Sequence, residues 1–577
     1  MIQHRSPISG IAAFARDYVA TAGYDNQVIL WDAREKLALT RAVHDHLVNQ
    51  CSFSACGRYL VTASSDFTVR VWSIPNLRLL AVMHHDDDVE MAVFDSKAER
   101  VATASRDRRA RIFDRSGHLV HELRGHEADV LQIEWISDSE LLSCSDDGDI
   151  RVWDADSGAL RSSTRFGGAQ MDAVAAGFGG VVYAGNDRGE ILVLNGAETA
   201  AIEAHRAGIK RLVVDRGRKL LVSMAYDRCI RTWQIGDDGG LTALDATEAP
   251  AQVWLRSCAL DGYGRLVVGT FGSSYGAFDF QSRTWCFAKV EDTPGLNAVA
   301  EANGAVLSVG DAGIVWRDGV ELSRPGTLCN FLLPFGDRVV TGGQTGEIYD
   351  AMTARVLYTH HSPINCGVCI ERNGEQLCLL GTYSGEGLVF RDDGDRLSLV
   401  ANLAMSTSAI KGLATDGVTI FGTSANASVV FFAVATLEPT RIVPDAHGQI
   451  VNGATCCRPG VFGSVSRDLF LRLWENGRSV PFETPHHHSV RCVTTCKESR
   501  LVASGAYDGT IAIFDLDTRT WLGETRPTHA GISSICASSS PGEFLASSYD
   551  GFAYRISVAN RTITAARAIR SALAAVA

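Results

Sequence analysis

The stretch "FSACGRYLVTASSDFTVRVWS", from Phe53 to Ser73, indicates the basic unit of the fold. It holds two strand-like segments around a turn, with Asp66 in the turn and Trp72 six residues later. Polar and apolar residues alternate from Thr68 to Val71, which is the period of a β-strand with two different faces. The stretch therefore predicts a β-hairpin with a carboxylate in its turn and a large indole on its second strand.

The same arrangement recurs along the chain at a step of about forty residues, which indicates a repeat architecture. Eight clear copies carry the turn aspartate, at Asp25, Asp66, Asp107, Asp147, Asp227, Asp468, Asp508 and Asp550. Six weaker copies fill the gaps in phase, among them "AGNDRGEILVLN" and "GTYSGEGLVFRD", and bring the total to fourteen. Each copy contains several short strands joined by Gly, Asp and Ser turns, so we expect an all-β fold.

A histidine precedes the turn in the well-formed copies, and two copies end in a Trp-Asp pair, Trp31-Asp32 and Trp153-Asp154. With these residues and this period, the sequence resembles the WD-repeat β-propeller family over almost its whole length. In that family each repeat forms a four-stranded blade, and the blades pack radially around a central channel. The resemblance implies two tandem seven-bladed WD-repeat β-propellers, which we place at residues 1–288 and 289–565, with the junction in "RTWCFAKVEDTPG".

The last stretch, "ARAIRSALAAVA" at residues 566–577, differs from the repeats because it is rich in alanine. Ile569, Leu573 and Val576 fall at helical spacing. We expect an Ala-rich C-terminal tail, either frayed or forming a short helix on its own propeller, in preference to a helix that docks on a partner.

The resemblance also implies a structural tetrad of His, Ser or Thr, turn Asp and Trp in each well-formed blade. A carboxylate in a tight turn needs donors, and an imidazole, a hydroxyl and an indole N–H supply a buried polar chain. The matching residues are His4, Thr21, Asp25 and Trp31; Thr62, Asp66 and Trp72 with His44 or His46; His126, Ser143, Asp147 and Trp153; His205, Ser223, Asp227 and Trp233; and His447, Ser464, Asp468 and Trp474.

Several copies depart from this pattern. Phe113 and Phe514 replace the Trp and remove its N–H, and Ala546 replaces the Ser or Thr of the last copy. Copies seven to eleven keep little of the tetrad. We therefore expect the first half of the second propeller to be less regular than the rest.

The composition bounds the function classes. The chain has 577 residues with 46% hydrophobic and 21% charged residues, the balance of a folded protein, and a formal net charge of −12. This charge argues against a generic nucleic-acid or anionic-membrane binder. We find no apolar run of membrane-spanning length and no signal peptide, so we expect a cytoplasmic protein with its fifteen cysteines reduced.

Histidines invite a metal interpretation, above all next to the acidic Asp86, Asp87 and Asp88. The candidates are His44, His46, His84, His85, His360, His361 and His486 to His488. Because these positions fall where each copy expects its structural histidine, we favour structural or surface histidines over a metal site, and we predict neither metal nor cofactor. The triple histidine, His486 to His488, could still bind a divalent metal adventitiously.

Two short motifs are typical of enzymes but occur in the wrong context. "GSSYG", Gly272 to Gly276, matches the Gly-x-Ser-x-Gly of serine hydrolases, which needs a strand-to-helix turn, whereas here it falls in a turn between strands. "CGVC", Cys366 to Cys369, lies on an expected strand, where residues three apart face opposite sides. We expect no catalytic residue from either motif.

In the family, the residue before the turn Asp lies on one rim of the propeller, its top face, where partners dock. In the first propeller these residues are Tyr24, Ser65, Arg106, Asp146 and Tyr226, and in the second they are Arg467, Tyr507 and Tyr549. Tyr and Arg dominate binding hot spots, so we assign partner binding to Tyr24, Arg106, Tyr226, Arg467, Tyr507 and Tyr549. The nearby Arg108, Arg109 and Arg111 favour an acidic or phosphorylated segment as the ligand.

The sequence thus favours a non-catalytic scaffold that presents its top faces to protein partners, with the first propeller as the better binding face. The abundance of Ala, Gly and Arg suggests a bacterial assembly for signalling, stress or defence. One alternative is a small-ligand sensor or a propeller enzyme with a site at the channel mouth, which convergent titratable groups would favour. Another is a double propeller of the actin-interacting type, which has a similar layout.

Overall fold

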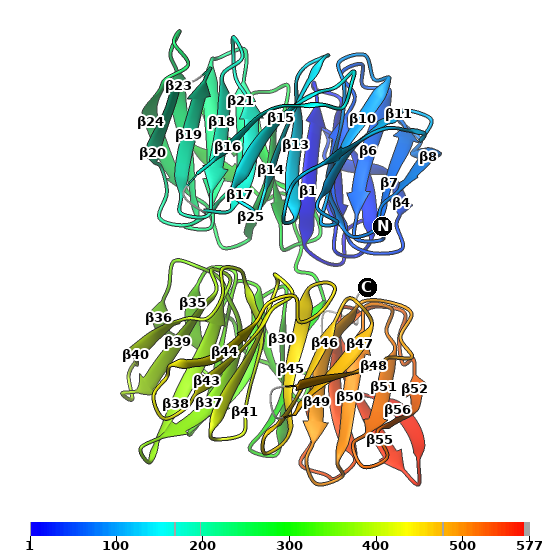
Figure 1. The fold of residues 1–577 in the computed structure, drawn as a ribbon, viewed down its shortest axis with the longest axis vertical. Coiled ribbons are helices and arrows are strands. Elements are labelled where there is room, and N and C mark those ends of the chain that lie inside the picture. Colours follow the sequence, from blue (N-terminus) through cyan, green and yellow to red (C-terminus); the bar gives the residue numbers. More distant parts are fainter. Residues whose placement is uncertain (1, 167–168, 197, 476–477, 571–577) are drawn as a thin grey trace. The chain divides into compact units, whose positions relative to one another are not determined.

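The computed structural model describes residues 2–166, 169–196, 198–475 and 478–570. These residues contain no α-helix, and their strands form fourteen four-stranded antiparallel sheets. Each sheet consists of four strands that follow one another in the chain, so each is one blade, numbered 1 to 14 in chain order (Figure 1). The predicted all-β fold of fourteen four-stranded blades is confirmed.

The chain divides into two compact units, Met1–Glu291 and Asp292–Ala577, with seven blades in each. The expected division between residues 288 and 289 lies next to this boundary. The outermost strand of blade 14, β56 (Thr562–Arg570), pairs with β55 (Phe552–Ala559), and Ile569 lies opposite Ala553. Residues 566–570 therefore complete a blade and do not form the expected tail, whereas 571–577, with Leu573 and Val576, lie outside the described residues.

Each blade of the first unit has an innermost, a second, a third and an outermost strand. The innermost strands are β1 (Ile8–Phe14), β5 (Val48–Phe53), β9 (Val89–Phe94), β13 (Val130–Ser137), β17 (Met171–Ala176), β21 (Ile209–Asp215) and β25 (Val253–Leu260). The second strands are β2 (Tyr18–Gly23), β6 (Tyr59–Ser64), β10 (Arg100–Ser105), β14 (Glu140–Ser145), β18 (Val182–Asn186), β22 (Leu220–Ala225) and β26 (Arg265–Thr270). The third strands are β3 (Gln27–Asp32), β7 (Thr68–Ser73), β11 (Arg109–Asp114), β15 (Asp149–Asp154), β19 (Glu190–Asn195), β23 (Cys229–Ile235) and β27 (Gly276–Asp279). The outermost strands are β4 (Leu37–Val43), β8 (Arg78–His84), β12 (Leu119–Arg124), β16 (Leu160–Arg165), β20 (Glu198–Glu203), β24 (Leu241–Glu248) and β28 (Thr284–Cys286).

The second unit repeats this plan. Its innermost strands are β29 (Leu296–Ala302), β33 (Cys329–Phe335), β37 (Ile364–Arg372), β41 (Ile410–Thr415), β45 (Val451–Arg458), β49 (Val490–Cys496) and β53 (Ile532–Ala537). The second strands are β30 (Ala305–Gly310), β34 (Arg338–Gly343), β38 (Glu375–Thr382), β42 (Thr419–Ser424), β46 (Val461–Ser466), β50 (Leu501–Ala506) and β54 (Glu543–Ser548). The third strands are β31 (Val315–Arg317), β35 (Glu347–Asp350), β39 (Glu386–Asp392), β43 (Val429–Ala433), β47 (Phe470–Glu475), β51 (Ile511–Asp515) and β55. The outermost strands are β32 (Val320–Ser323), β36 (Val356–Thr359), β40 (Leu397–Ala404), β44 (Pro439–Val443), β48 (Arg478–Glu483), β52 (Thr520–Thr525) and β56.

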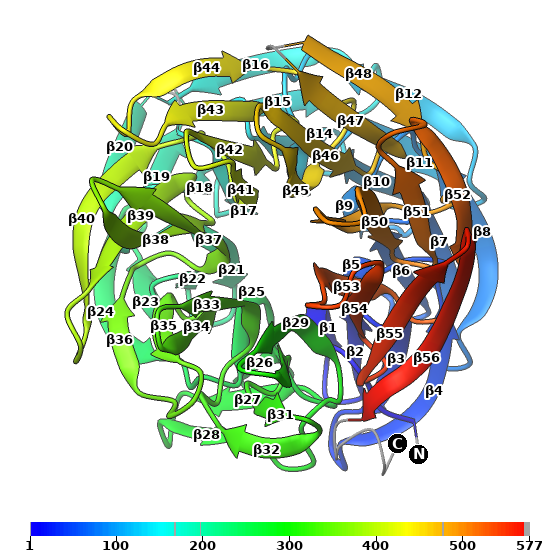
Figure 2. The same ribbon diagram turned by 90° about the horizontal axis from the view of Figure 1, so that it is seen from below.

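Each unit is a closed ring. In the first unit β1 packs against β5 on one side and against β25 on the other, and in the second β29 packs against β33 and β53. Figure 2 shows the innermost strands of each unit close to its axis and the outermost strands at its periphery. Because every blade is continuous in sequence, both rings close by side-chain packing between the first and seventh blades, without exchange of a strand.

The burial of the strands follows from this arrangement. The second strands are buried almost throughout, as in β6 and β10, because neighbouring blades cover both of their faces. The outermost strands are mostly exposed, as in β16 and β20. The apolar core is accordingly divided into clusters between successive blades, such as the one that joins Val61, Val71, Val89 and Phe113.

A β-bulge interrupts the pairing of every innermost strand with the second strand, just after the innermost strand begins. In thirteen blades it leaves one unpaired residue: Ser9, Asn49, Glu90, Leu131, Asp172 and Lys210 in the first unit, and Asn297, Asn330, Asn365, Lys411, Asn452, Arg491 and Ser533 in the second. A bulge re-aims a side chain, and here it does so next to the turn between the second and third strands. We call this edge of each propeller its rim face, formed by the bulge residues and these turns.

Candidate partner-binding faces

The five tetrads expected from the sequence are each joined by hydrogen bonds. In blade 1, Trp31 Nε1 donates to Thr21 Oγ1 over 2.7 Å, His4 Nε2 lies 2.7 Å from the same oxygen, and His4 Nδ1 lies 3.0 Å from Asp25 Oδ1. The same links join the four residues in blades 4, 6 and 12. In blade 2 the histidine is His44 and not His46, since His44 Nδ1 lies 2.8 Å from Asp66 Oδ2 and His46 Nδ1 accepts from the Leu47 N–H.

The hydrogen bonds of the tetrad determine which nitrogen of the imidazole carries the proton. The Asp66 carboxylate can only accept, so His44 Nδ1 carries the N–H. In the neutral imidazole Nε2 then accepts from the Thr62 hydroxyl, which itself accepts from the Trp72 indole. Burial, only partly offset by Asp66, lowers the pKa of His44, so the neutral form is retained. Burial would raise the pKa of Asp147, but the hydrogen bond from His126 and two backbone N–H groups hold it at about 2.

These shifts predict a loss of stability in acid. His44 and His447 have lowered folded-state pKa values, so their contribution is present above the ordinary value of 6.5 and declines as the pH falls below it. Asp147 adds a contribution that is present above 3.8 and is lost as the pH falls towards about 2. The raised pKa values of Asp129 and Asp146 act in the opposite sense in the first propeller, so the test is made on the second. There His447 and His486 both have lowered pKa values, and we expect the unfolding free energy of this propeller, measured by urea titration between pH 8 and pH 4, to decrease below pH 6.5. A flat profile would contradict this.

Three blades with an incomplete tetrad keep part of the network. In blade 3 His85 Nε2 lies 2.9 Å from Thr103 Oγ1 beside Phe113, and in blade 13 His486 Nε2 lies 2.8 Å from Ser504 Oγ beside Phe514. In blade 14, where Ala546 removes the hydroxyl, Asp550 accepts instead from Thr528 Oγ1 and from the Tyr554 hydroxyl, each over 2.6 Å. The sequence reasoning missed this replacement, although a tyrosine four residues after the turn Asp was a visible signal.

Five of the thirteen bulge residues of the rim faces link successive blades. Asn49 Nδ2 donates to the Val89 carbonyl at the start of the next innermost strand over 2.9 Å, and Asn330, Asn365 and Asn452 make the same bond in the second unit. Ser9 Oγ bonds the corresponding carbonyl of Val48. A small amide or hydroxyl is thus the side chain that ties one blade to the next.

The bulge residues depart from this rule in two places. In the first unit Glu90, Leu131, Asp172 and Lys210 follow one another in blades 3 to 6. In the second unit Lys411 and Arg491 occupy blades 11 and 13. Charged residues at a position that otherwise links blades mark these two sectors of the rim faces as candidates for binding.

The first rim face holds an ionic network around Arg106. Arg106 Nε donates to Glu90 Oε1 over 2.6 Å, and its Nη1 pairs with Asp129. Arg256 bonds the other oxygen of Glu90 over 2.9 Å and the Tyr24 hydroxyl over 3.2 Å, and Tyr24 packs edge-on against Trp254. The predicted Tyr24 and Arg106 therefore lie in one network, although their neighbours come from other blades.

The same face continues at Lys210, which pairs with Asp172 and lies 4.9 Å from the centroid of the Tyr226 ring. Of the arginines near Arg106, Arg111 is buried against Asp107, and Arg109 pairs with Asp86 and Glu122. These two arginines are therefore held by carboxylates of their own blade and its loops and do not extend the network of Arg106.

Carboxyl groups outnumber the cationic side chains on this face. Glu90, Asp129, Asp146, Asp172 and Asp187 share the cations Arg106, Arg188, Lys210 and Arg256. Burial, and then Asp87 and Glu90, raise the pKa of Asp129 to about 6 despite Arg106, and burial with Asp129 and Asp172 raises that of Asp146.

The second rim face combines cations with tyrosines. Lys411 Nζ lies 5.1 Å from the centroid of the Tyr383 ring, and a side-chain hydrogen bond joins Arg491 to Tyr549. The rings of Tyr507 and Tyr549 stack with centroids 6.2 Å apart and an interplanar angle of 17°. Arg467, half-buried, follows β46 in blade 12, between the blades of Lys411 and Arg491.

The two motifs typical of enzymes form ordinary parts of the blades, one a turn and the other a strand. Gly272 to Gly276 lead from β26 into β27, and Ser274 is buried in this turn. Cys366 and Cys369 both lie on β37, where burial raises their pKa values to about 12 and 11, so both thiols stay protonated. Neither motif meets the geometry that its chemistry requires.

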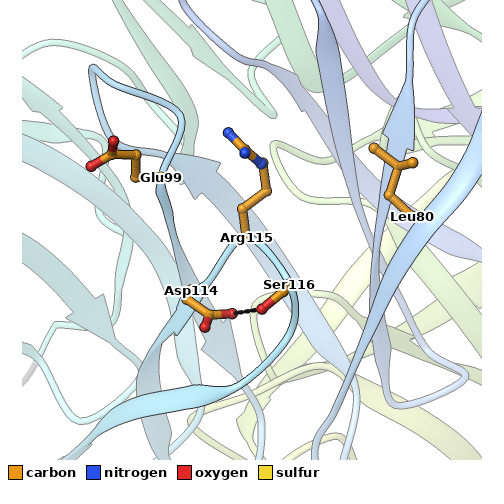
Figure 3. A pocket seen from close by; sticks show the side chains of 5 residues that line it. All are labelled: Leu80, Glu99, Asp114, Arg115 and Ser116. Carbon is orange, nitrogen blue, oxygen red and sulfur yellow. Dashed lines mark hydrogen bonds between the residues drawn. The ribbon is translucent and has the colours of Figure 1, made fainter.

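A hollow of about 390 Å³ lies away from the rim faces, between blades 2 and 3. Figure 3 shows Leu80, Glu99, Asp114, Arg115 and Ser116 around it, with Asp114 bonded to Ser116. Arg115 donates to the Ala98 carbonyl and its guanidinium packs over Tyr59. These side chains serve the blade contacts, and the hollow is not the channel-mouth site that the sensor or enzyme alternative needs.

Among the described residues, no helix has the length and hydrophobicity needed to span a membrane.

Comparisons with known proteins point to one repeat family. Residues 36–73, 117–154 and 479–515 match the family described as "WD domain, G-beta repeat". The chain is 26% identical over 122 residues to "Ribosome biogenesis protein YTM1" of Lodderomyces elongisporus, which covers 21% of this chain and 23% of that protein. It is 29% identical over 80 residues to "Beige protein homolog 1" of Schizosaccharomyces pombe, which covers 13% of this chain and 3% of that protein.

The chain therefore spans less than a quarter of the length of these two relatives. The family matches follow the structural repeat, because each of the three ends at the last residue of the third strand of a blade. With its WD40 repeats and its fourteen four-stranded blades, the chain is a WD-repeat protein with two seven-bladed β-propellers.

Proposed function

We propose that this protein is a non-catalytic scaffold that binds protein partners on the rim faces of its two propellers. WD40 propellers are usually non-catalytic interaction domains, and the family match supports the same role here. The observation that carries the proposal is the change at the bulge position, where charged residues replace the blade-linking amides and hydroxyls in one sector of each ring.

The first rim face is proposed to take a cationic segment. The acidic or phosphorylated ligand that we expected from Arg106 does not suit this face, because Arg106 is already paired with Glu90 and Asp129 within an excess of carboxylates. Burial, and then repulsion from neighbouring carboxylates, raises the pKa of Asp129 and Asp146, and a Lys or Arg side chain from a partner would stabilise their charged forms. Tyr24 and Tyr226 supply rigid apolar area next to this charge.

The second rim face is proposed to take an acidic or phosphorylated segment. Lys411, Arg467 and Arg491 supply the positive charge, and the hydroxyls of Tyr507 and Tyr549 supply directed hydrogen bonds. The two propellers would then hold two different partners, which is the task of a scaffold. A cytoplasmic assembly for signalling, stress or defence remains the proposed setting, and we carry over no pathway from the relatives, whose matches cover so little of the chain.

The first face is tested by removing charge without removing shape. The double change Asp146→Asn and Asp187→Asn is expected to weaken binding of a Lys/Arg-rich partner segment about tenfold, which corresponds to about 1.4 kcal/mol. The segment would be mapped in a partner purified with the protein from its native host, and its affinity measured by calorimetry.

The matched control is Asp156→Asn with Asp237→Asn, which removes the same charge from turns at the opposite edge of the same propeller. Their side chains are 71% and 95% exposed. If both double variants weaken binding of the segment equally, the effect comes from net charge alone, and a site on the rim face is refuted. Purification that yields a retained small molecule and no protein partner would favour the sensor or enzyme alternative.

A further inference from the structure

Blade 10 lacks the tetrad but keeps its histidine. The His360 N–H bonds the carbonyl of Gly346 over 2.9 Å, as the His205 N–H of the blade 6 tetrad bonds that of Gly189 over 2.8 Å. Where other blades carry the hydroxyl, the turn Asp and the Trp, blade 10 has Leu380, Ser384 and Phe390. The imidazole of His360 therefore has none of the partners that keep the other structural histidines occupied.

Two other ligand-type side chains lie next to this imidazole. His360 Nε2 is 3.4 Å from Glu386 Oε2, and His361 Nε2 is 3.9 Å from the same oxygen. One ligand atom from each of the three residues lies within 4.8 Å of the other two. A tetrahedral zinc ion with bonds of about 2.0–2.2 Å to N and O ligands holds them roughly 3.4 Å apart, so small side-chain shifts complete the geometry.

The surrounding groups orient these ligands as outer-shell partners do in metal sites. Glu386 accepts from Ser384 Oγ over 2.7 Å and from Asn402 Nδ2 over 2.6 Å, which fixes both carboxylate oxygens. His360 Nδ1 lies 3.4 Å from the Ser362 carbonyl, to which it donates when Nε2 is the ligand. The Ser362 N–H, 3.2 Å away, serves the other tautomer, in which Nε2–H faces Glu386.

We propose that His360, His361 and Glu386 form a binding site for Zn²⁺ in the second propeller. Their side chains are 8%, 49% and 24% exposed, so His360 anchors the site from inside and the side of His361 is open to solvent. The fourth position of the ion is then filled by water or by a side chain of a partner. The ion would tie the loop between blades 9 and 10 to the start of β39, the link that the tetrad makes in other blades.

The site is tested by zinc calorimetry, by the visible absorption of Co²⁺ at the site, and by thermal unfolding with and without Zn²⁺. The wild-type protein is expected to bind one Zn²⁺ with a rise in melting temperature and to give the intense absorption of tetrahedral Co²⁺. Glu386→Gln is expected to weaken Zn²⁺ binding at least about tenfold and to abolish the rise. His361→Asn, a change at a half-exposed side chain, should do the same if Glu386→Gln fails to fold.

The control is His487→Asn with His488→Asn, because the triple histidine is the longest run of neighbouring imidazoles in the sequence. Retained binding in this control, together with loss in Glu386→Gln or His361→Asn, supports the site. Loss confined to the control, or equal Zn²⁺ affinity in all variants, would mean adventitious binding and would overturn the proposal. Neither result bears on the partner experiment, which involves the first propeller.

Discussion

Replacing Gly310 by alanine is expected to destabilise the second propeller by about 3 kcal/mol. A Cβ atom at this position would lie 1.9 Å from the carbonyl oxygen of Gly295 and 2.8 Å from Leu296 Cα, both backbone atoms that cannot rotate away. That carbonyl also accepts the N–H of Asp311 over 3.0 Å, so the loop cannot retreat without losing a hydrogen bond. Thermal and urea unfolding measure the effect.

This close backbone approach occurs in blades 8 and 9. At the equivalent position blades 2, 3 and 4 carry Ser64, Ser105 and Ser145, so a side chain is accommodated there. In blade 9, Gly343 meets the same limit, because its Cβ would lie 1.9 Å from the Leu328 carbonyl oxygen. The loop backbone takes the space that a side chain occupies elsewhere.

The control for this prediction is Gly448→Ala in the same propeller. A Cβ there would be 3.7 Å from Asp468 Cβ, an ordinary contact, so the change should be neutral or slightly stabilising. If Gly310→Ala unfolds at the same urea concentration as Gly448→Ala, the close approach of the loop is not a feature of the folded protein.

The blades were predictable from the sequence because their signals are local. The turn Asp, the strand after it and the histidine before it all fall within one repeat, so a fixed spacing such as that of His126, Asp147 and Trp153 identifies the unit. The prediction of a tail or short helix was wrong for residues 566–570. Alanine has a high helix propensity, but blade 14 needs this segment as its outermost strand. Tertiary pairing of β56 with β55 overrides that preference.

The binding faces were less predictable because their neighbours come from different blades. Arg106 indicated an anionic ligand when considered with the arginines that follow it, but Glu90 and Asp129 reverse the charge of its surroundings. The bulge residues depend on the pairing register of the innermost strands, which the sequence pattern does not give. His361 and Glu386 are 25 residues apart (386 − 361) and meet only because one lies in a loop and the other begins β39.

Replacing Asp147 by alanine is expected to cost about 1–3 kcal/mol of the stability of the first propeller. Its side chain is only 3% exposed and accepts from His126 Nδ1 over 2.9 Å and from the N–H groups of Glu127 and Asp149 over 2.8 Å. The change leaves these three donors without their acceptor in a mostly buried turn. Asp156→Ala, at a side chain that is 71% exposed, should have no measurable effect.

A double-mutant cycle with Trp153→Phe separates the tetrad as a unit from the sum of its bonds. Trp153 Nε1 donates to Ser143 Oγ over 2.8 Å, and that oxygen lies 2.9 Å from His126 Nε2. Once Asp147 is gone, His126 is no longer held in one tautomer, so the indole bond loses part of its worth. The combined loss of unfolding free energy should therefore be smaller than the sum of the two single losses. Strict additivity would mean that the four residues stabilise the blade independently.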